Sequence, residues 1–94
     1  MVRADFDPMK DEENLRKHGL PLLAAVRVFE GPFIEEVDRR RSYGETRFVA
    51  TGPHPALEDR ICGVVYTWRG GKRRIISFRK ANDREIRNYR NRYA

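Results

Sequence analysis

A tight hairpin near the end of the chain constrains the fold more than any other feature of the sequence. Gly70 and Gly71 separate two runs of β-branched, aromatic and charged residues, ICGVVYTWR over 61–69 and KRRIISFRK over 72–80. Two glycines between such runs indicate a two-residue turn, because both central residues of that turn need positive φ. The sequence therefore predicts two long antiparallel strands around this turn.

Helices are predicted on both sides of the strand region. In DPMKDEENLRKHG, over 7–19, Asp7 suits the N-cap, Pro8 the first helical position and Gly19 the end of a helix. Apolar spacing predicts a second short helix within 20–31. The other predicted elements are strands at 2–6, 33–38 and 46–52, loops at 39–45 and 53–59, and a final helix over 82–94 capped by Asn82 or Asp83.

This order of elements predicts a single α+β domain spanning residues 1–94. Helices gathered at the ends of an antiparallel meander cover one face of the sheet and leave the other partly free. A binding site is expected on that free face or at its rim.

Alternation along the hairpin determines which of its cations share a surface. Around a two-glycine turn, strict alternation places Arg74 and Lys80 on one face. The opposite face then carries Arg73, Ser77 and Arg79. A β-bulge would exchange the faces beyond it. Two interpretations stay open: the cations protect an edge strand from aggregation, or they bind phosphates, which guanidinium groups fit well.

Basic residues are concentrated toward the end of the chain. Residues 1–59 hold 9 Lys or Arg against 12 Asp or Glu, whereas residues 60–94 hold 11 against 2. A charge polarised in this way is typical of proteins that present a cationic face to a polyanion.

Several kinds of chemistry find no support in the sequence. Cys62, the single cysteine, cannot form an internal disulfide and is predicted to be a buried thiol. His18 and His54 are far apart, and no Cys, His and acidic cluster has the spacing of metal ligands, so no metal or cofactor is expected. His54, between two prolines, is predicted to lie on the surface. With no membrane-spanning run and no signal-peptide core, a cytoplasmic protein is expected.

Three groups of residues allow both a structural and a functional interpretation. Lys17 and His18, at the end of the first predicted helix, either complement the helix dipole or supply a general acid or base. Tyr89, on the last helix, either packs on the sheet or contacts a substrate. The run RRR over 39–41 forms either a solvated turn or a phosphate contact.

Four stretches together resemble the BrnT toxin family: FDPMKDEENLRKHG, GETRFVATG, VVYTWRGGKRRIISFRKAN and REIRNYR. BrnT proteins are the ribonuclease halves of bacterial type II toxin–antitoxin systems. The resemblance spans nearly the whole chain and implies a RelE-like fold, an antiparallel β-sheet with two N-terminal helices and one C-terminal helix. It also implies an RNA substrate, a ribbon-helix-helix antitoxin of the BrnA type, and operator DNA bound only through the toxin–antitoxin complex.

The motifs NLRKHG and RIISFRKA, with the start of the last helix, indicate where the family's site residues fall in this chain. We predict six catalytic residues: Lys17, His18, Arg74, Arg79, Lys80 and Glu85. We predict five substrate-binding residues: Arg69, Lys72, Arg73, Ser77 and Tyr89.

The implied reaction uses the 2′-OH of RNA as nucleophile, so the protein must align it with the phosphorus and stabilise the developing charge. Arg74 and Arg79 would bind the nonbridging oxygens. Lys80 or Lys17 would offset charge on the leaving oxygen, and His18 would move a proton. No step needs a metal, but Arg74 and Arg79 must share a cleft with His18.

Two other interpretations stay open. The same cations could bind phosphates or an acidic antitoxin segment without cleavage, as a non-catalytic module of an autorepressing complex. The chain could also be a toxin that has lost its activity and serves only in a repressor. Incubation with RNA would separate the ribonuclease from the binding module, because only the ribonuclease gives fragments. Toxicity on expression in bacteria, relieved by a neighbouring antitoxin, would separate the ribonuclease from the inactive toxin.

Overall fold

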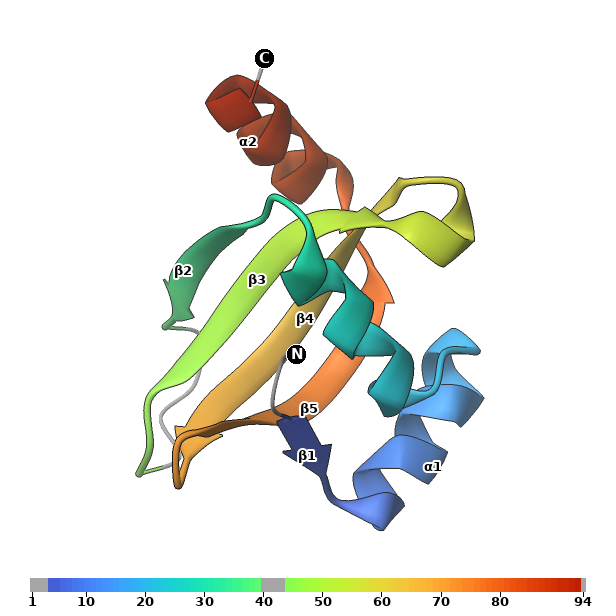
Figure 1. Ribbon diagram of the computed structural model, residues 1–94, viewed down its shortest axis with the longest axis vertical. Coiled ribbons are helices and arrows are strands. Elements are labelled where there is room, and N and C mark those ends of the chain that lie inside the picture. Colours follow the sequence, from blue (N-terminus) through green and yellow to red (C-terminus); the bar gives the residue numbers. More distant parts are fainter. Residues whose placement is uncertain (1–3, 40–43, 94) are drawn as a thin grey trace.

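The hairpin predicted around Gly70 and Gly71 lies within a five-stranded sheet (Figure 1). Both glycines have positive φ, at 60° and 77°, as the turn requires. The computed structural model describes residues 4–39 and 44–93. In these ranges the strands are β1 (Ala4–Phe6), β2 (Ile34–Asp38), β3 (Arg47–His54), β4 (Arg60–Arg69) and β5 (Lys72–Lys80). Their order across the sheet is β1-β5-β4-β3-β2.

The predicted strands are present, with some changes at their ends. β3 continues to His54 and a short 3-10 turn, η2 (Pro55–Leu57), follows it, so only residues 58–59 of the loop predicted at 53–59 remain between elements. Residues 2–3 of the first predicted strand lie outside the described residues. So do residues 40–43 of the predicted loop, which include two arginines of the RRR run.

The sheet is mixed, so the prediction of an antiparallel sheet was wrong for one strand. β1 pairs in parallel with β5, with Phe6 opposite Ile75, whereas the other neighbours are antiparallel. The path of the chain gives the reason. After Phe6 the chain enters a helix whose Asn14 bonds to the backbone of Phe78. Strand and helix therefore follow β5 in the same direction along one edge.

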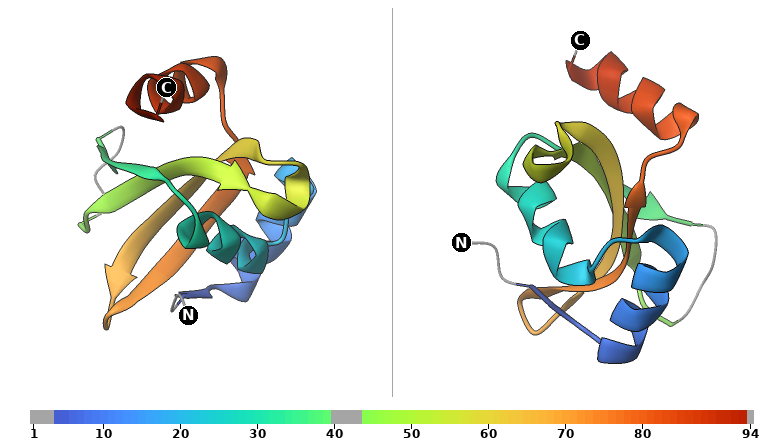
Figure 2. Two further views of the ribbon diagram at one scale, coloured as in Figure 1. Left: turned by 45° about the horizontal axis from the view of Figure 1, so that its top comes forward. Right: turned by 90° about the vertical axis from the view of Figure 1, so that its right-hand side faces the viewer.

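Among the described residues, three helices besides the short η2 flank the sheet (Figure 2). α1 (Pro8–His18) begins with Asp7, whose carboxylate accepts the Met9 N–H, and ends at Gly19 with φ of 70°. The second predicted helix is a 3-10 helix, η1 (Leu22–Glu30). α2 (Asp83–Tyr93) is capped by Asn82, which exchanges side-chain hydrogen bonds with Glu85 in a capping box. No helix in the described part of the chain has the length and apolar composition needed to cross a membrane.

The hydrophobic core lies between η1 and one face of the sheet. The largest fully buried side chains at its centre come from η1, β4 and β5: Leu22, Val28, Val64, Tyr66, Ile75 and Phe78. Cys62 belongs to the same cluster, which confirms the predicted buried thiol. Burial raises the pKa of this thiol, because the apolar surroundings disfavour the thiolate.

His54 is buried, so its predicted place on the surface was wrong. The Nε2 atom lies 2.8 Å from the Ala24 carbonyl oxygen, and Nδ1 accepts the Ala56 N–H. The ring stacks on Phe78 with centroids 5.5 Å apart. The imidazole therefore ties η1 and η2 to the sheet, a contact that the flanking prolines do not reveal.

A β-bulge exchanges the faces of the hairpin beyond its middle. The pairing shifts between Val65 and Tyr66, so that Tyr66 lies opposite Ile75 and Val65 opposite Ser77. Ile76 is the additional residue. Strict alternation had put Ser77 and Arg79 on the face of Arg73, and that assignment was wrong. Ser77 and Arg79 instead lie opposite Val65 and Gly63, on the face that Arg74 shares.

Candidate active-site pocket

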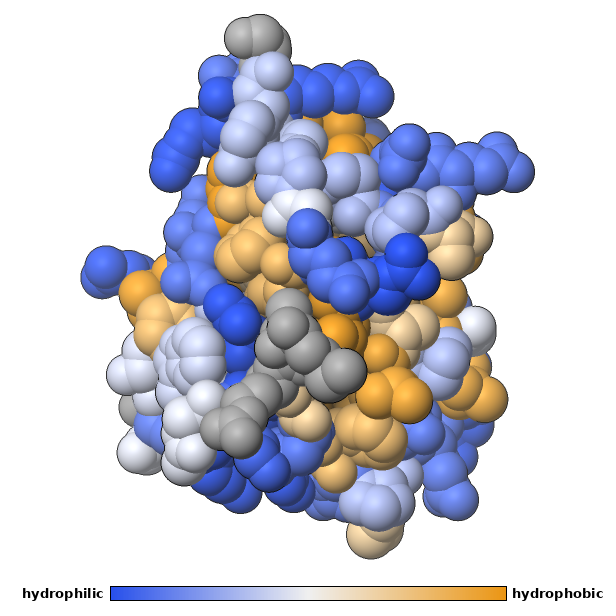
Figure 3. All heavy atoms as spheres, in the orientation of Figure 1, coloured by the Kyte–Doolittle hydropathy of each residue, from blue (hydrophilic) through white to orange (hydrophobic). Residues whose placement is uncertain are grey.

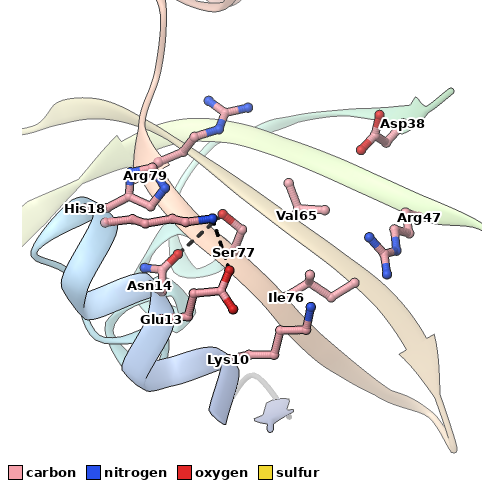
Figure 4. Close-up of a pocket in the computed structure, with 11 residues that line it drawn as sticks. Lys10, Glu13, Asn14, His18, Asp38, Arg47, Val65, Ile76, Ser77 and Arg79 are labelled. Carbon is pink, nitrogen blue, oxygen red and sulfur yellow. Dashed lines mark hydrogen bonds and ion pairs between the residues drawn. The ribbon is translucent and has the colours of Figure 1, made fainter. Parts of the chain in front are cut away.

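A pocket of about 490 Å³ lies between α1 and the sheet face that η1 leaves open (Figure 4). It draws side chains from α1 and from four strands, so that no single segment of the sequence encodes it. Its lining residues are Lys10, Glu13, Asn14, Lys17, His18, Asp38, Arg47, Val65, Ile76, Ser77 and Arg79.

α1 supplies one wall through side chains that share a helix face. Three, four, seven and eight residues after Lys10 come Glu13, Asn14, Lys17 and His18, which is the spacing of one helical surface. Lys17 Nζ lies 3.0 Å from Glu13 Oε1. This hydrogen bond and the lysine charge lower the pKa of the Glu13 carboxyl. Both groups are exposed, so Lys17 remains accessible to an anion.

Asn14 fixes α1 against β5. Its amide donates to the carbonyl oxygens of Phe78, at 2.8 Å, and Leu20, at 2.7 Å. Its oxygen accepts the Phe78 N–H at 3.0 Å and lies 3.4 Å from Ser77 Oγ. Asn14 is buried and its polar atoms are satisfied, so these hydrogen bonds fix the distance between α1 and β5. His18, four residues later, takes its position from this anchor.

Arg79 forms the opposite wall. Its two terminal nitrogens donate to the two carboxylate oxygens of Glu85, at 2.6 and 2.9 Å. Glu85 also accepts the Asn82 N–H at the start of α2, so the guanidinium is held by a side chain that is itself fixed. Across the hairpin, Gly63 leaves room for this group, since a Cβ there would lie 2.9 Å from an Arg79 nitrogen.

Cations outnumber carboxylates in the pocket lining. The cations are Lys10, Lys17, Arg47 and Arg79, and the carboxylates are Glu13 and Asp38. His18 is an additional titratable group. An excess of positive charge in a concave site attracts anions. Among residues 4–39 and 44–93 there is no group of three or more His, Cys, Asp or Glu side chains that could hold a metal ion.

Four predicted site residues line this pocket: Lys17, His18, Ser77 and Arg79. Glu85 contacts Arg79 from the side of α2. Arg74 lies on the same sheet face but is not part of the lining, and its guanidinium is 3.6 Å from Asp5. The structure therefore brings Arg79 and His18 to one pocket and leaves Arg74 outside it.

The other predicted site residues lie elsewhere. Arg73 faces the covered side, where its guanidinium stands 4.2 Å from the Phe29 ring and 4.6 Å from the Trp68 ring. Tyr89 is buried, and its hydroxyl donates to the Pro32 carbonyl oxygen at 2.9 Å. Three more predicted residues are exposed and outside the pocket: Arg69, Lys72 and Lys80.

Five lining residues with polar side chains were missed in the sequence: Lys10, Glu13, Asn14, Asp38 and Arg47. The first three could have been found by extending the helical spacing back from Lys17 and His18. The last two depend on the register of β2 with β3, in which Asp38 lies opposite Arg47. No local signal gives that register.

The chain is similar to one protein family in sequence and to a solved structure in fold. Residues 6–85 match the family model described as ribonuclease toxin, BrnT, of type II toxin–antitoxin system. The chain belongs to the BrnT family. The crystal structure of the Brucella abortus ribonuclease toxin BrnT is similar, with a TM-score of 0.56 at 22% identity over 88% of this chain and 100% of that one. A comparison with curated protein sequences finds no match.

Every residue of the pocket lies inside the part of the chain that matches the BrnT family. Glu85 is the last residue of the match, and the rest of α2 lies beyond it. The structural likeness shows that the BrnT fold is shared. The resemblance to RelE stays a prediction.

Proposed function

We propose that this chain is an endoribonuclease whose RNA phosphate binds between α1 and β5. One observation carries the proposal: His18 and Arg79, 61 positions apart, line a single cationic pocket in a chain of a ribonuclease toxin family. A histidine can move protons near neutral pH, and a fixed guanidinium can stabilise a phosphorane-like transition state. These are the two capabilities that RNA cleavage by its own 2′-OH needs.

Arg79 would bind a nonbridging oxygen of the scissile phosphate. A guanidinium has more N–H groups than the two that Glu85 engages, so donors remain for the substrate. The bidentate pair holds the group in place before RNA binds, which lowers the cost of organising the site. Glu85 is a positioning residue in this mechanism, because it acts through Arg79.

α1 would supply the groups that move protons and offset charge. In the reaction a bond forms between the 2′ oxygen and phosphorus, while the bond to the 5′ oxygen breaks. The 2′-OH loses its proton and the 5′ oxygen gains one, leaving a 2′,3′-cyclic phosphate. His18 would carry one of these protons, and Lys17 would stabilise negative charge on the leaving oxygen.

Arg74 and Lys80 have no direct part in this revised mechanism. Arg74 is outside the pocket and close to Asp5. Lys80 lies opposite Cys62, on the other alternation of the sheet from Arg79. Ser77 stays next to the phosphate position through its contact with Asn14. The catalytic set proposed here is therefore Lys17, His18 and Arg79.

The remaining parts of the proposal rest on family membership. They are a metal-independent reaction in the cytoplasm, growth arrest through loss of translated RNA, and neutralisation by a ribbon-helix-helix antitoxin of the BrnA type. Operator DNA would be bound only through the toxin–antitoxin complex.

The test is incubation of the purified protein with single-stranded RNA in EDTA, with analysis of the fragment ends. Cleavage to 2′,3′-cyclic phosphate ends supports the proposal, provided that His18→Ala and Arg79→Ala lose the activity and Arg16→Ala, an exposed arginine on the same helix as His18, keeps it. Intact RNA after incubation with the wild type would overturn it.

A second candidate is a binding module without catalysis. The observation in its favour is that Arg79 already has a carboxylate partner, as does Arg74. Such a module would retain RNA in a salt-sensitive manner and leave it intact. If it also suppresses expression only together with its antitoxin, the chain acts as a toxin that has lost its activity.

A further inference from the structure

α2 carries an arginine surface that the cleavage mechanism does not use. We define the α2 arginines as Arg84, Arg87, Arg90 and Arg92, all of which are exposed. Within the described part of the chain none of them has an ion pair. Carboxylates elsewhere hold six other cations: Lys17, Arg27, Arg47, Arg69, Arg74 and Arg79.

The energetics of an isolated helix oppose cations at the start of α2, whereas Arg90 and Arg92 lie in its last turn, where cations are favourable. Arg84 is the second residue of α2, where the partial positive charge of the helix N-terminus disfavours a cation. Arg84, Arg87 and Arg90 follow one another at intervals of three residues, so like charges are neighbours along the helix surface. A local arrangement that costs stability without a gain in the fold is typical of a functional surface.

Arg84 and Arg87 lie away from the side on which α2 is anchored. The hydroxyl of Tyr89 donates to the Pro32 carbonyl oxygen at 2.9 Å, and that of Tyr93 to Phe33 at 3.2 Å. At 100° per residue, Arg84 and Arg87 lie about 120–180° around the helix from both tyrosines. Arg90 lies closer to Tyr93 and lines a different hollow, with Glu58 and Asp59. Figure 1 places α2 at one end of the molecule, where Figure 3 shows long hydrophilic side chains projecting.

This surface is continuous with the cleavage pocket. The pair between Arg79 and Glu85 joins the pocket to the first turn of α2. A second hollow of about 690 Å³ on the same sheet face shares Asp38 with the pocket. Its charged lining residues are Arg39 and Arg84 with Glu36, Asp38 and Glu85, so Arg84 stands at its α2 side. A chain of phosphates that leaves the pocket past Arg79 thus reaches Arg84 first.

We propose that two of the α2 arginines, Arg84 and Arg87, hold the sugar–phosphate backbone of single-stranded RNA beside the cleaved phosphate. The inference rests on the proposed ribonuclease function and adds a docking surface to it. The arginines contact phosphates rather than bases, so they set affinity and salt dependence without sequence preference. They do not touch the reacting atoms, so they contribute to KM and not to kcat.

The experiment uses the double variant Arg84→Gln/Arg87→Gln and a matched control, Arg16→Gln/Arg27→Gln, which removes the same charge from exposed positions on α1 and η1. The probe is a short RNA with 2′-O-methyl groups throughout, which keeps its phosphates but has no nucleophile. Its affinity is measured over a salt series. Unmodified RNA then gives KM and kcat for each protein.

Each phosphate contact to a single strand contributes about 0.7 to the slope of log affinity against log salt, so the α2 variant should lose about 1.4. The wild type would then lose about 25-fold more affinity than the variant when salt rises tenfold. KM should rise while kcat stays unchanged, and the control should behave like the wild type.

Equal slopes for the variant and the control would overturn the inference. So would a variant that binds the RNA normally but no longer retains polyglutamate that the wild type binds, since the surface would then fit an acidic protein segment. If the wild type binds the modified RNA through α2 but does not cleave unmodified RNA, the proposed function fails while the docking surface stands.

Discussion

Arg73 and Arg79 lie on the same strand and have opposite environments. Arg73 points to the covered face, where the rings of Phe29, Tyr66 and Trp68 surround its guanidinium within 5.3 Å. Burial there lowers the pKa of Arg73. Arg79 points to the open face, where a carboxylate holds it at the wall of a pocket. The sequence RRIISFRK alone does not tell which arginine packs within the fold and which can bind a phosphate.

The two faces use charge in different ways. On the covered face a cation is stabilised by aromatic rings and is partly shielded from solvent. On the open face cations stand around a hollow that an anion can enter. The bulge at Ile76 places Ser77 and Arg79 on the open face, so one additional residue in β5 determines which of these roles each arginine has.

The largest expected effect comes from Arg79→Ala on the open face. Removal of one donor that stabilises a developing oxyanion costs about 2.7–4 kcal/mol, so the cleavage rate should fall by roughly 10²–10³. The measurement is kcat on a defined RNA, with the circular dichroism spectrum as a check on folding. Arg74→Ala is the matched control, since Arg74 shares the face but not the pocket. An equal loss in both variants would contradict the assignment of the phosphate to Arg79 alone.

Asn14→Ala tests the hydrogen bonds that hold α1 on β5. The change leaves the Phe78 N–H and carbonyl oxygen without their side-chain partner, and a buried polar group in that state costs roughly 1–3 kcal/mol. The free energy of unfolding in urea should fall by that order. Asn14→Asp should not restore it, because the Phe78 and Leu20 carbonyl oxygens would then face a carboxylate. Full stability of either variant would show that α1 is held by other contacts.

Cys62 makes the stability of the folded protein depend on pH. Burial raises the pKa of the folded-state thiol above its ordinary value of 9.0, so the folded protein holds this proton more tightly than the unfolded chain. Its contribution to stability is fully present below that value and is lost as the pH rises toward the folded-state pKa, by up to about 1.4 kcal/mol per pH unit. Urea unfolding at about pH 7, 8, 9 and 10, compared with Cys62→Ala, isolates this slope. If the free energy of unfolding changes with pH in the same way in both proteins, the thiol has the same pKa in the folded and unfolded states.

The smallest expected effect is that of Arg73→Met. A thioether fits among aromatic rings, and it removes the Nε atom that lies buried without a hydrogen bond in the described structure. The cation–π contribution that is lost is about 0.5–2 kcal/mol and is largely offset, so the midpoint of urea unfolding should change little. The cleavage rate should stay within about twofold of the wild type, because the side chain faces away from the pocket. A large rate loss with unchanged stability would return Arg73 to the substrate-binding residues.

Much of the fold could be read from local signals. Asp7, Pro8 and Gly19 marked the ends of α1, and Gly70 and Gly71 marked the hairpin, because caps and tight turns depend on a few adjacent residues. Family motifs pointed to Lys17, His18, Ser77 and Arg79, all of which line the pocket. The same motifs also pointed to Arg74 and Lys80, which do not.

The sequence by itself determined the helix ends, the hairpin, the buried Cys62 and the polarised charge, since each depends on nearby residues or on composition. Only the tertiary structure decided the parallel pairing of β1, the bulge at Ile76 and the meeting of His18 with Arg79. These features depend on contacts between distant segments, such as Asn14 with Phe78. Strand register is a choice among pairings of similar local energy, and packing across the whole domain selects one of them.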